Sequence, residues 1–161
     1  MKRLILSIST LILIISSCFG IFYFERNKKL AILENAILSS EIVHFKYDYG
    51  SYFMGYFEYD ISKSNEKTTL TAHGYNGVDL NINTEINPSA LNDILEIVKE
   101  QNIAAWNDFS KSNDNILDGY SFSIYIEFKN GETINAHGYE KYPKNYDIAH
   151  KALSNYLEKL K

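Results

Sequence analysis

Two histidines stand in a short phrase that the sequence contains twice. Ala72-His73-Gly74-Tyr75 returns 64 residues later as Ala136-His137-Gly138-Tyr139. Histidine binds metals and exchanges protons near neutral pH, so two equivalent strands could bring His73 and His137 to one shared site. Zinc takes three or four ligands, however, and the chain contains neither an HExxH nor an HxH pattern. We therefore expect no metal site and treat both histidines as binding candidates.

Tyrosines form the second group of candidate residues. Tyr75 and Tyr139 end the two copies of the phrase, and Tyr52, Tyr56 and Tyr125 lie in other strand-like stretches. A tyrosine carries a large apolar ring and a polar hydroxyl, which suits it to protein interfaces. We expect these residues to form a contact surface for a protein or peptide partner. The competing interpretation is that they pack in the scaffold with their hydroxyls at the rim.

Motifs of catalysis and phosphate binding are missing from the sequence. Cys18 is the only cysteine, and neither GxSxG, GxxxxGK[ST] nor GxGxxG occurs. The acidic stretch 108–118 lacks the residue order and the central glycine of an EF-hand. We expect a protein that is not an enzyme, has no catalytic residues and needs no cofactor.

The first 24 residues differ from the rest of the chain. After the basic start, residues 4–24 form an uncharged, mainly apolar run of 21 residues, close to the ~20 that a membrane-spanning helix needs. Within it, Ile15-Ser16-Ser17-Cys18 resembles the signal of a bacterial lipoprotein, which is cleaved and acylated at its cysteine. The two interpretations weigh about evenly, and both tether the remaining chain to a membrane. We place the domain outside the cytoplasm, because a very short basic N-terminal tail usually stays inside.

The charge of the chain argues against nucleic-acid binding. The chain has 16 Lys and Arg against 20 Asp and Glu, and its formal net charge is −4. Beyond the basic start, Arg26 is the only arginine. Arginine is the usual side chain for phosphate and base recognition, so an acidic chain with so little of it is a poor nucleic-acid binder.

The hydrophobic periodicity divides the chain into an anchor (1–24), a helical stalk (25–40) and one domain (41–161). Alternating residues predict strands, and residues spaced three or four apart predict helices after Pro88 and Pro143. The expected strands are 41–49, 52–61, 68–75, 78–86, 120–128 and 132–139. At 128–132 we expect a three-residue hairpin loop with Gly131 left-handed, because this register buries Ile134.

These elements predict an α+β fold. We expect an antiparallel sheet of about six strands with two helices on one face, preceded by the membrane anchor helix. The repeated phrase suggests two related strand–strand–helix units. The strands before the two phrases are out of phase, so duplication and convergence both stay open.

The second half of the chain resembles a group of uncharacterised bacterial membrane-anchored or lipoprotein domains. The resemblance rests on the tryptophan of Trp106-Asn107-Asp108-Phe109, the Asp118-Gly119 that opens a strand, the hairpin, and Tyr142-Pro143-Lys144-Asn145-Tyr146 before a helix. It implies an exported domain of unknown function and brings no catalytic residues.

We therefore expect a non-catalytic binding or interaction module anchored at a membrane. The first alternative is an acidic inhibitor or immunity-type protein that neutralises a basic partner, and it predicts clustered carboxylates. The second is a metal-dependent hydrolase that uses His73 and His137, and it requires the two rings to lie within a few ångström of each other.

Overall fold

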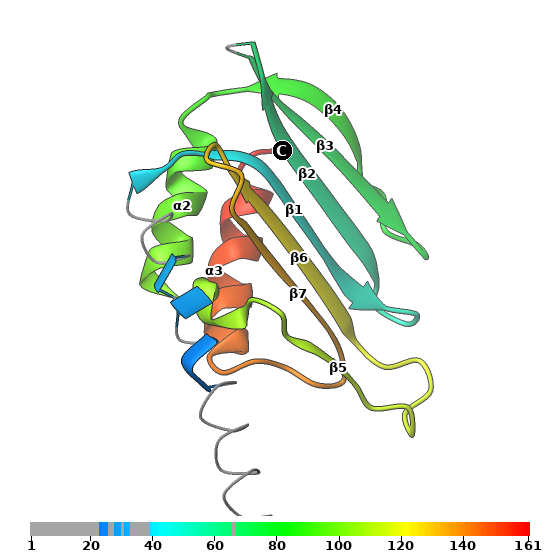
Figure 1. Ribbon diagram of the computed structural model, residues 1–161. Coiled ribbons are helices and arrows are strands. Elements are labelled where there is room, and N and C mark those ends of the chain that lie inside the picture. Colours follow the sequence, from blue (N-terminus) through cyan, green and yellow to red (C-terminus); the bar gives the residue numbers. More distant parts are fainter. Residues whose placement is uncertain (1–22, 26–27, 30, 33–38, 66) are drawn as a thin grey trace, which may run out of the picture.

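A seven-stranded sheet with helices on one face forms the body of the protein (Figure 1). The structure, a computed structural model, describes residues 23–25, 28–29, 31–32, 39–65 and 67–161. The described residues of 23–32, and Ser39, are helical. The remaining elements are β1 (Ile42–Ser51), β2 (Gly55–Ser64), β3 (Lys67–Tyr75), β4 (Asn81–Ile86), α2 (Ala90–Glu100), the 3₁₀ helix η1 (Ile103–Trp106), β5 (Ser110–Ser112), β6 (Ser121–Phe128), β7 (Thr133–Tyr139) and α3 (Tyr146–Glu158).

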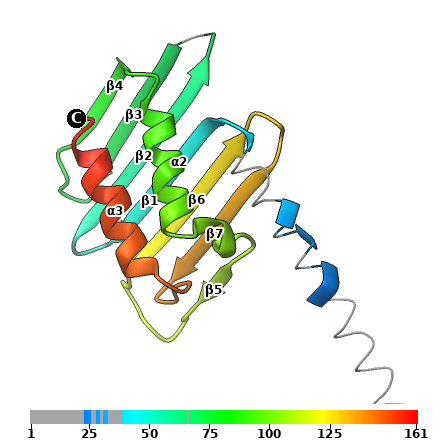
Figure 2. The same ribbon diagram turned by 90° about the vertical axis from the view of Figure 1, so that its left-hand side faces the viewer.

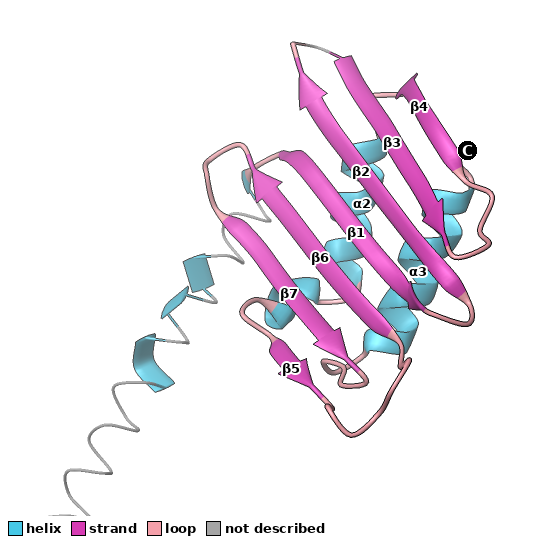
Figure 3. Cartoon of the chain, turned by 90° about the vertical axis from the view of Figure 1, so that its right-hand side faces the viewer, coloured by secondary structure: helices cyan, strands magenta, loops and turns pink. Residues whose placement is uncertain are grey.

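The strand order in the sheet is β4-β3-β2-β1-β6-β7-β5 (Figure 3). The pairs from β4 through to β7 are antiparallel, and β5 pairs with β7 in parallel. β1 lies in the middle, between the hairpin β2–β3 and the hairpin β6–β7. Each hairpin is followed along the chain by a helix, α2 after β4 and α3 after β7.

Helices α2 and α3 cover one face of the sheet and leave the other uncovered (Figures 2 and 3). The sidedness follows from the alternation along each strand, which puts every second side chain on the same face. On the covered face, Phe45, Tyr47 and Ile124 are fully buried, and Leu91 and Leu153 of the two helices are buried with them. We call the other face the open face.

The expected fold class is wrong in its sheet. The sheet has seven strands rather than about six, and it is mixed rather than antiparallel. No helix among the described residues is long and apolar enough to cross a membrane. The expected anchor, 1–24, and its lipidation candidate Cys18 lie outside the described residues, apart from residues 23 and 24.

The strand that the sequence did not predict is β5 (Ser110–Ser112), which we expected to be part of a loop. Its sequence, Ser110-Lys111-Ser112, has no apolar alternation, and all three residues are exposed. β5 exists because its backbone pairs with β7, with Ser110 beside His137 and Ser112 beside Tyr139. A strand that is held only by its neighbour leaves no periodic signal in the sequence.

The β6–β7 hairpin has the expected register. The Phe128 amide donates to the Glu132 carbonyl at 2.9 Å, and Gly131 is left-handed with φ 85°. Ile134 and Ala136 consequently face the helices. The alternation along β1 is broken at its start, where a register shift between Ile42 and His44 leaves Ile42 buried and Val43 only half-buried.

The repeated phrase performs the same structural task in both hairpins. Ala72 and Ala136 are both buried under the helices. A Cβ atom on Gly74 would collide with Val78, and one on Gly138 would collide with the Lys141 carbonyl oxygen. Both glycines therefore let the chain that follows the strand fold back closely over it.

Candidate functional site

Most charged side chains on the open face pair with one another. Lys46 on β1 donates to Glu58 on β2 at 2.7 Å, and the Tyr75 hydroxyl donates to the same carboxylate at 3.1 Å. His44 lies 3.0 Å from Asp60. The hydrogen bond from Lys46 lowers the pKa of Glu58 and holds it as a carboxylate. These pairs fill the β2–β3 side of the face.

One row of polar side chains crosses the open face at a single level. In the strand register, His73 on β3 lies opposite Glu58 on β2, and Glu58 lies opposite Asp48 on β1. Asp48 in turn lies opposite Ser123 on β6, and Ser123 lies opposite His137 on β7. The two phrases therefore place their histidines at the same height on the same face, on opposite sides of β1. Four strand spacings separate them, which is about 19 Å.

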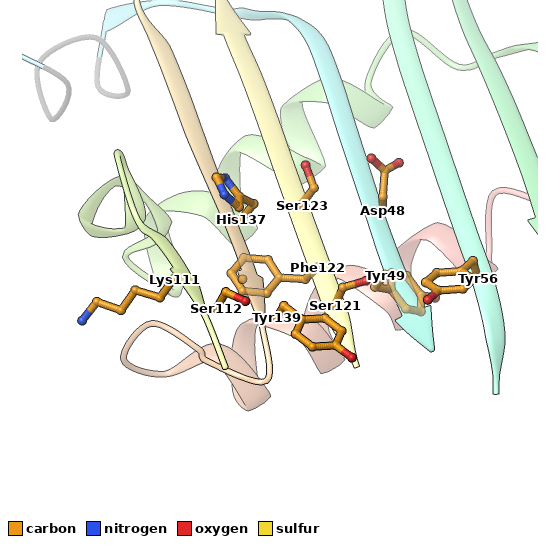
Figure 4. A pocket seen from close by; sticks show the side chains of 11 residues that line it. Asp48, Tyr49, Tyr56, Lys111, Ser112, Ser121, Phe122, Ser123, His137 and Tyr139 are labelled. Carbon is orange, nitrogen blue, oxygen red and sulfur yellow. The ribbon is translucent and has the colours of Figure 1, made fainter. Parts of the chain in front are cut away.

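A depression of about 360 Å³ lies at the end of this row that is nearer to β6 and β7 (Figure 4). The open-face side chains that line it and matter for its chemistry are Asp48, Tyr56, Ser121, Ser123, His137 and Tyr139. We call it the Asp48 depression. In the figure these six come from β1, β2, β6 and β7, and Lys111 and Ser112 of β5 also line the hollow, so it extends from the centre of the sheet to the β5 edge.

The depression exists because small residues form its floor between two larger walls. In the next row across the sheet, Tyr56 lies opposite Gly50 in the strand register. Gly50 lies opposite Ser121, and Ser121 lies opposite Tyr139. The two tyrosines are three strand spacings apart, about 14 Å. Gly50 has φ 144°, and a Cβ atom there would collide with the backbone of Gly55. The floor is therefore kept low at this position by the backbone itself.

Asp48 is the carboxylate at the centre of the depression. Its Oδ1 atom is buried and has no described hydrogen-bond partner. The pKa of Asp48 is raised to about 6, mainly by burial; Lys46 opposes the shift, and the nearby carboxylates of Glu58 and Asp60 contribute to it. The carboxylate is poorly solvated and incompletely paired, so a donor placed in the depression would stabilise its charged form.

The wall at Tyr139 is held in place by the chain behind it. Its hydroxyl accepts from the Gly119 amide at 2.7 Å and donates to the Ile116 carbonyl at 2.9 Å. The neighbouring His137 is exposed, and its Nε2 lies 2.9 Å from the Ser110 hydroxyl on β5. These contacts fix one wall without filling the hollow.

The remaining expected site residues lie outside the depression. Tyr125 is on the open face one row beyond Ser123, and its hydroxyl bonds to Glu127 at 3.3 Å. Tyr52 is 60% exposed in the β1–β2 turn. His73 and Tyr75 lie on β3, beyond the paired side chains of β2. Among the seven expected residues, the structure thus brings together Tyr56, His137 and Tyr139.

The geometry gives no support to a metal centre that His73 and His137 share. The two are separated by the full width of three intervening strands. Within the described part of the chain, no group of three or more His, Cys, Asp or Glu side chains could hold a metal ion. The hydrolase alternative needs such a group.

Asp48, Ser121 and Ser123 are the site residues that sequence reasoning missed. Each sits in a strand that was expected, on the polar side of its alternation. The usable signal is the pair of serines in β6, short side chains on a face that elsewhere carries Lys, Glu and Tyr. The pairing of β6 with β1 joins segments far apart in the sequence, so no local pattern predicts it.

A second polar cluster, partly buried, lies between α3 and the sheet. His150 of α3 lies with its Nδ1 2.8 Å from the Tyr47 hydroxyl and its Nε2 3.4 Å from the Tyr120 hydroxyl. Burial lowers the pKa of His150, which favours the neutral ring between the two hydroxyls. This cluster ties α3 to β1 within the core, and we assign it to the scaffold.

Comparisons with known proteins add no further constraint on the site. No family model, no curated protein and no solved structure matches the chain. The resemblance to bacterial exported domains therefore stays a prediction from the sequence.

Proposed function

We propose that this protein is a non-catalytic binding module whose ligand occupies the Asp48 depression. The observation that carries the proposal is the buried, unpartnered Oδ1 of Asp48 in a hollow of about 360 Å³ on a face that no described helix covers. Hollows of roughly 300–1,000 Å³ are typical of small-ligand sites. The ligand can be a small molecule or a side chain of a peptide or protein.

The lining supports recognition more than catalysis. Tyrosine rings provide rigid contact area at low entropic cost, and serine hydroxyls provide adaptable hydrogen bonds. The nucleophile–base contact nearest to the depression joins Ser110 and His137, and Ser110 is exposed at the sheet edge. No described carboxylate bonds to the other ring nitrogen of His137, so the third member of a catalytic triad has no candidate among the described residues.

The alternative of an acidic inhibitor has weaker support. It requires a cluster of free carboxylates facing a basic partner. On the open face, however, Glu58 is paired with Lys46 and Asp60 with His44. Glu127 has no described ion pair either, but it lies outside the depression, so Asp48 alone offers the depression a negative charge, which fits one cationic group better than a basic protein surface.

A panel of N-acetyl amino-acid methylamides covering the twenty side chains tests the proposal. Each compound is titrated into the isotope-labelled full chain while amide chemical shifts are recorded. We expect at least one compound to shift the signals of Asp48, Ser121 and Ser123. The variant Ser123→Leu, which fills the floor, should lose the effect and keep its fold. A panel without any shift, or with shifts confined to other surfaces, would overturn the proposal.

The N-terminal sequence supports a proposal for the place where the module works. We propose that it acts outside the cytoplasm and is held at a membrane through residues 1–24. Intact-mass measurement of the membrane-extracted protein tests this, because a diacylated product beginning at Cys18 has a distinct mass. Recovery of the protein from the cytosol with its leader attached and no lipid would contradict it.

A further inference from the structure

We propose that the Asp48 depression binds a primary ammonium group, from a lysine side chain or a free alkylamine, with Asp48 as its counter-ion. This inference rests on the proposed function, because it names the ligand class for the same site. It is carried by the set of acceptors in the depression, by the aromatic walls and by the charge of the chain.

The acceptors match the donors of an ammonium group in number. An ammonium has three N–H donors and no acceptor. Asp48 offers the unpartnered Oδ1, and the hydroxyls of Ser123 and Ser121 lie on the neighbouring strand in the same row and the next one. Ser121 donates only a long 3.5 Å bond to the Gly50 carbonyl, and a hydroxyl keeps two acceptor lone pairs. Three residues with oxygen acceptors, on two adjacent strands, therefore line the depression, as many as the donors of one ammonium group.

The electrostatics of the depression favour a cation. Asp48 supplies the only carboxylate among the described residues that line it. The nearest lysine on the open face, Lys46, donates to Glu58 instead, so it leaves Oδ1 without a charged partner. Lys111 also borders the depression, but its Nζ lies 5.5 Å from the centroid of the Phe109 ring, and Figure 4 shows its side chain extending away. A charge-assisted hydrogen bond from a ligand would supply the missing partner.

The walls and the net charge act in the same direction. Tyr56 and Tyr139 stand on opposite sides of the floor, and a cation near the face of an aromatic ring is attracted by its quadrupole. The chain has a formal net charge of −4, which draws cations towards it. A calcium ion would need six to eight oxygen ligands, more than one carboxylate and two hydroxyls provide.

Three probes test the ligand class on the full chain at pH 7.5. N-acetyl-lysine methylamide carries the ammonium, N-acetyl-norleucine methylamide has a similar apolar chain without it, and n-butylamine is a free amine. We expect both amines to shift the signals of Asp48 and Ser123, with the norleucine compound at least tenfold weaker. Tighter binding of the lysine compound indicates a peptide or protein side chain as the natural source, and tighter binding of butylamine indicates a free amine.

Two variants locate the charge that is recognised. Asp48→Asn keeps the shape of the side chain and should weaken amine binding at least tenfold. Glu127→Gln removes the same charge from the open face outside the depression, and it should change binding less than twofold. Asp48→Asn is expected to stabilise the fold, so loss of binding in this variant does not reflect unfolding; Ser123→Leu provides a second, independent block.

The pH dependence provides a separate readout. The charged and titratable groups that face Asp48 are Lys46 on β1, Glu58 and Asp60 on β2 and His137 on β7. Because burial raises the pKa of Asp48 to about 6, amine binding should weaken about tenfold between pH 7.5 and pH 5. The variant His137→Gln should retain this dependence, since Asp48 causes it.

The failures of the two proposals differ. If the norleucine compound binds as well as the lysine compound, or Asp48→Asn retains full affinity for amines, the ligand class is wrong while the binding site stands. If arginine or hydroxyl-bearing compounds of the panel bind and lysine does not, the conclusion is the same. If none of the panel reaches the depression, both proposals fall.

Discussion

The open face of the sheet differs on the two sides of β1. On the β2–β3 side, Glu58 accepts hydrogen bonds from Lys46 and Tyr75, and the face is filled. On the β6–β7 side, Asp48 faces Ser123, and its Oδ1 has no described partner. Both sides are built from hairpins that end in the same four-residue phrase, so the phrase does not determine whether a hollow forms.

The difference shows which residues belong to the scaffold and which to the site. The alanine and glycine of each phrase meet the same packing demand in both hairpins. The hollow depends on side-chain length in the neighbouring strands, with Glu58 and Tyr56 on β2 and Ser123 and Ser121 on β6. A repeat in sequence can therefore mark common architecture while function resides in the positions where the halves differ.

The largest expected effect tests the scaffold role of the two glycines. Gly138→Ala should lower the free energy of unfolding by about 3 kcal/mol, because its Cβ atom would meet the Lys141 carbonyl oxygen, which is backbone and cannot turn away. Gly74→Ala should cost about 2 kcal/mol, because part of its clash is with the Val78 side chain. Urea denaturation followed by circular dichroism measures both.

Ser112→Ala on the exposed strand β5 is the control for this pair. Its free energy of unfolding should stay within about 0.5 kcal/mol of the native value. If Gly138→Ala were as stable as this control, the phrase would have no scaffold role, and its recurrence would need another explanation.

The two tyrosines of the phrase provide the next comparison. Tyr139→Phe removes the hydroxyl that accepts from the buried Gly119 amide, and an unsatisfied buried donor costs about 2 kcal/mol. Tyr75→Phe removes a hydroxyl that is solvent exposed and bonded to Glu58, so it should cost less than about 0.5 kcal/mol. Thermal unfolding of the two variants measures the difference. Equal losses would show that the rim on the β6–β7 side is no more constrained than its counterpart.

The sequence predicts local features of this fold well. The β6–β7 hairpin has the expected register, because alternation in the strand and a glycine in the loop determine it together. Sequence reasoning misses β5, since Ser110-Lys111-Ser112 becomes a strand only through pairing with β7. The shift that buries Ile42 in place of Val43 likewise depends on the partner strand β6.

The candidate site is predicted in part for the same reason. Tyr56, His137 and Tyr139 can be named from their residue types and from the repeat. Asp48 and Ser123 gain their meaning only when β1 and β6 are neighbours, although 75 positions separate these two residues in the chain. A hollow depends on the side chains of neighbouring strands. The pattern within one strand contains no information on which strand lies beside it.

The third prediction concerns the stability that Asp48 costs the fold. Its pKa is raised by burial from 3.8 to about 6, so the folded state binds the proton more tightly than the unfolded chain does. Stability therefore falls as the pH rises from about 4 to 6. Asp48→Asn removes this penalty and should be more stable by about 1 kcal/mol at pH 7, a figure reduced for the water that still reaches the carboxylate.

Urea denaturation of Asp48→Asn and the native chain at pH 7 and at pH 3.5 measures this linkage. The difference should nearly vanish at the lower pH, where the carboxyl is mostly protonated in both states. A variant that binds no amine and yet is more stable would show that the chain retains a destabilising group for recognition. Lower stability of Asp48→Asn at pH 7 would show instead that Asp48 has a partner inside the protein.

The smallest expected effect has the opposite sign and lies across β1. Hydrogen bonding to Lys46 lowers the pKa of Glu58, so its carboxylate stabilises the fold above pH 4.5, and this contribution is lost as the pH falls through the lowered value. Glu58→Gln should therefore destabilise the protein at pH 7, by about 0.5 kcal/mol because the pair is partly exposed. Raising the salt concentration should shrink this loss further, since water and ions reach both groups. Two carboxylates that face each other in adjacent strands would then respond to the same chemical change in opposite directions, which is the behaviour expected when one is paired within the fold and the other is left for a ligand.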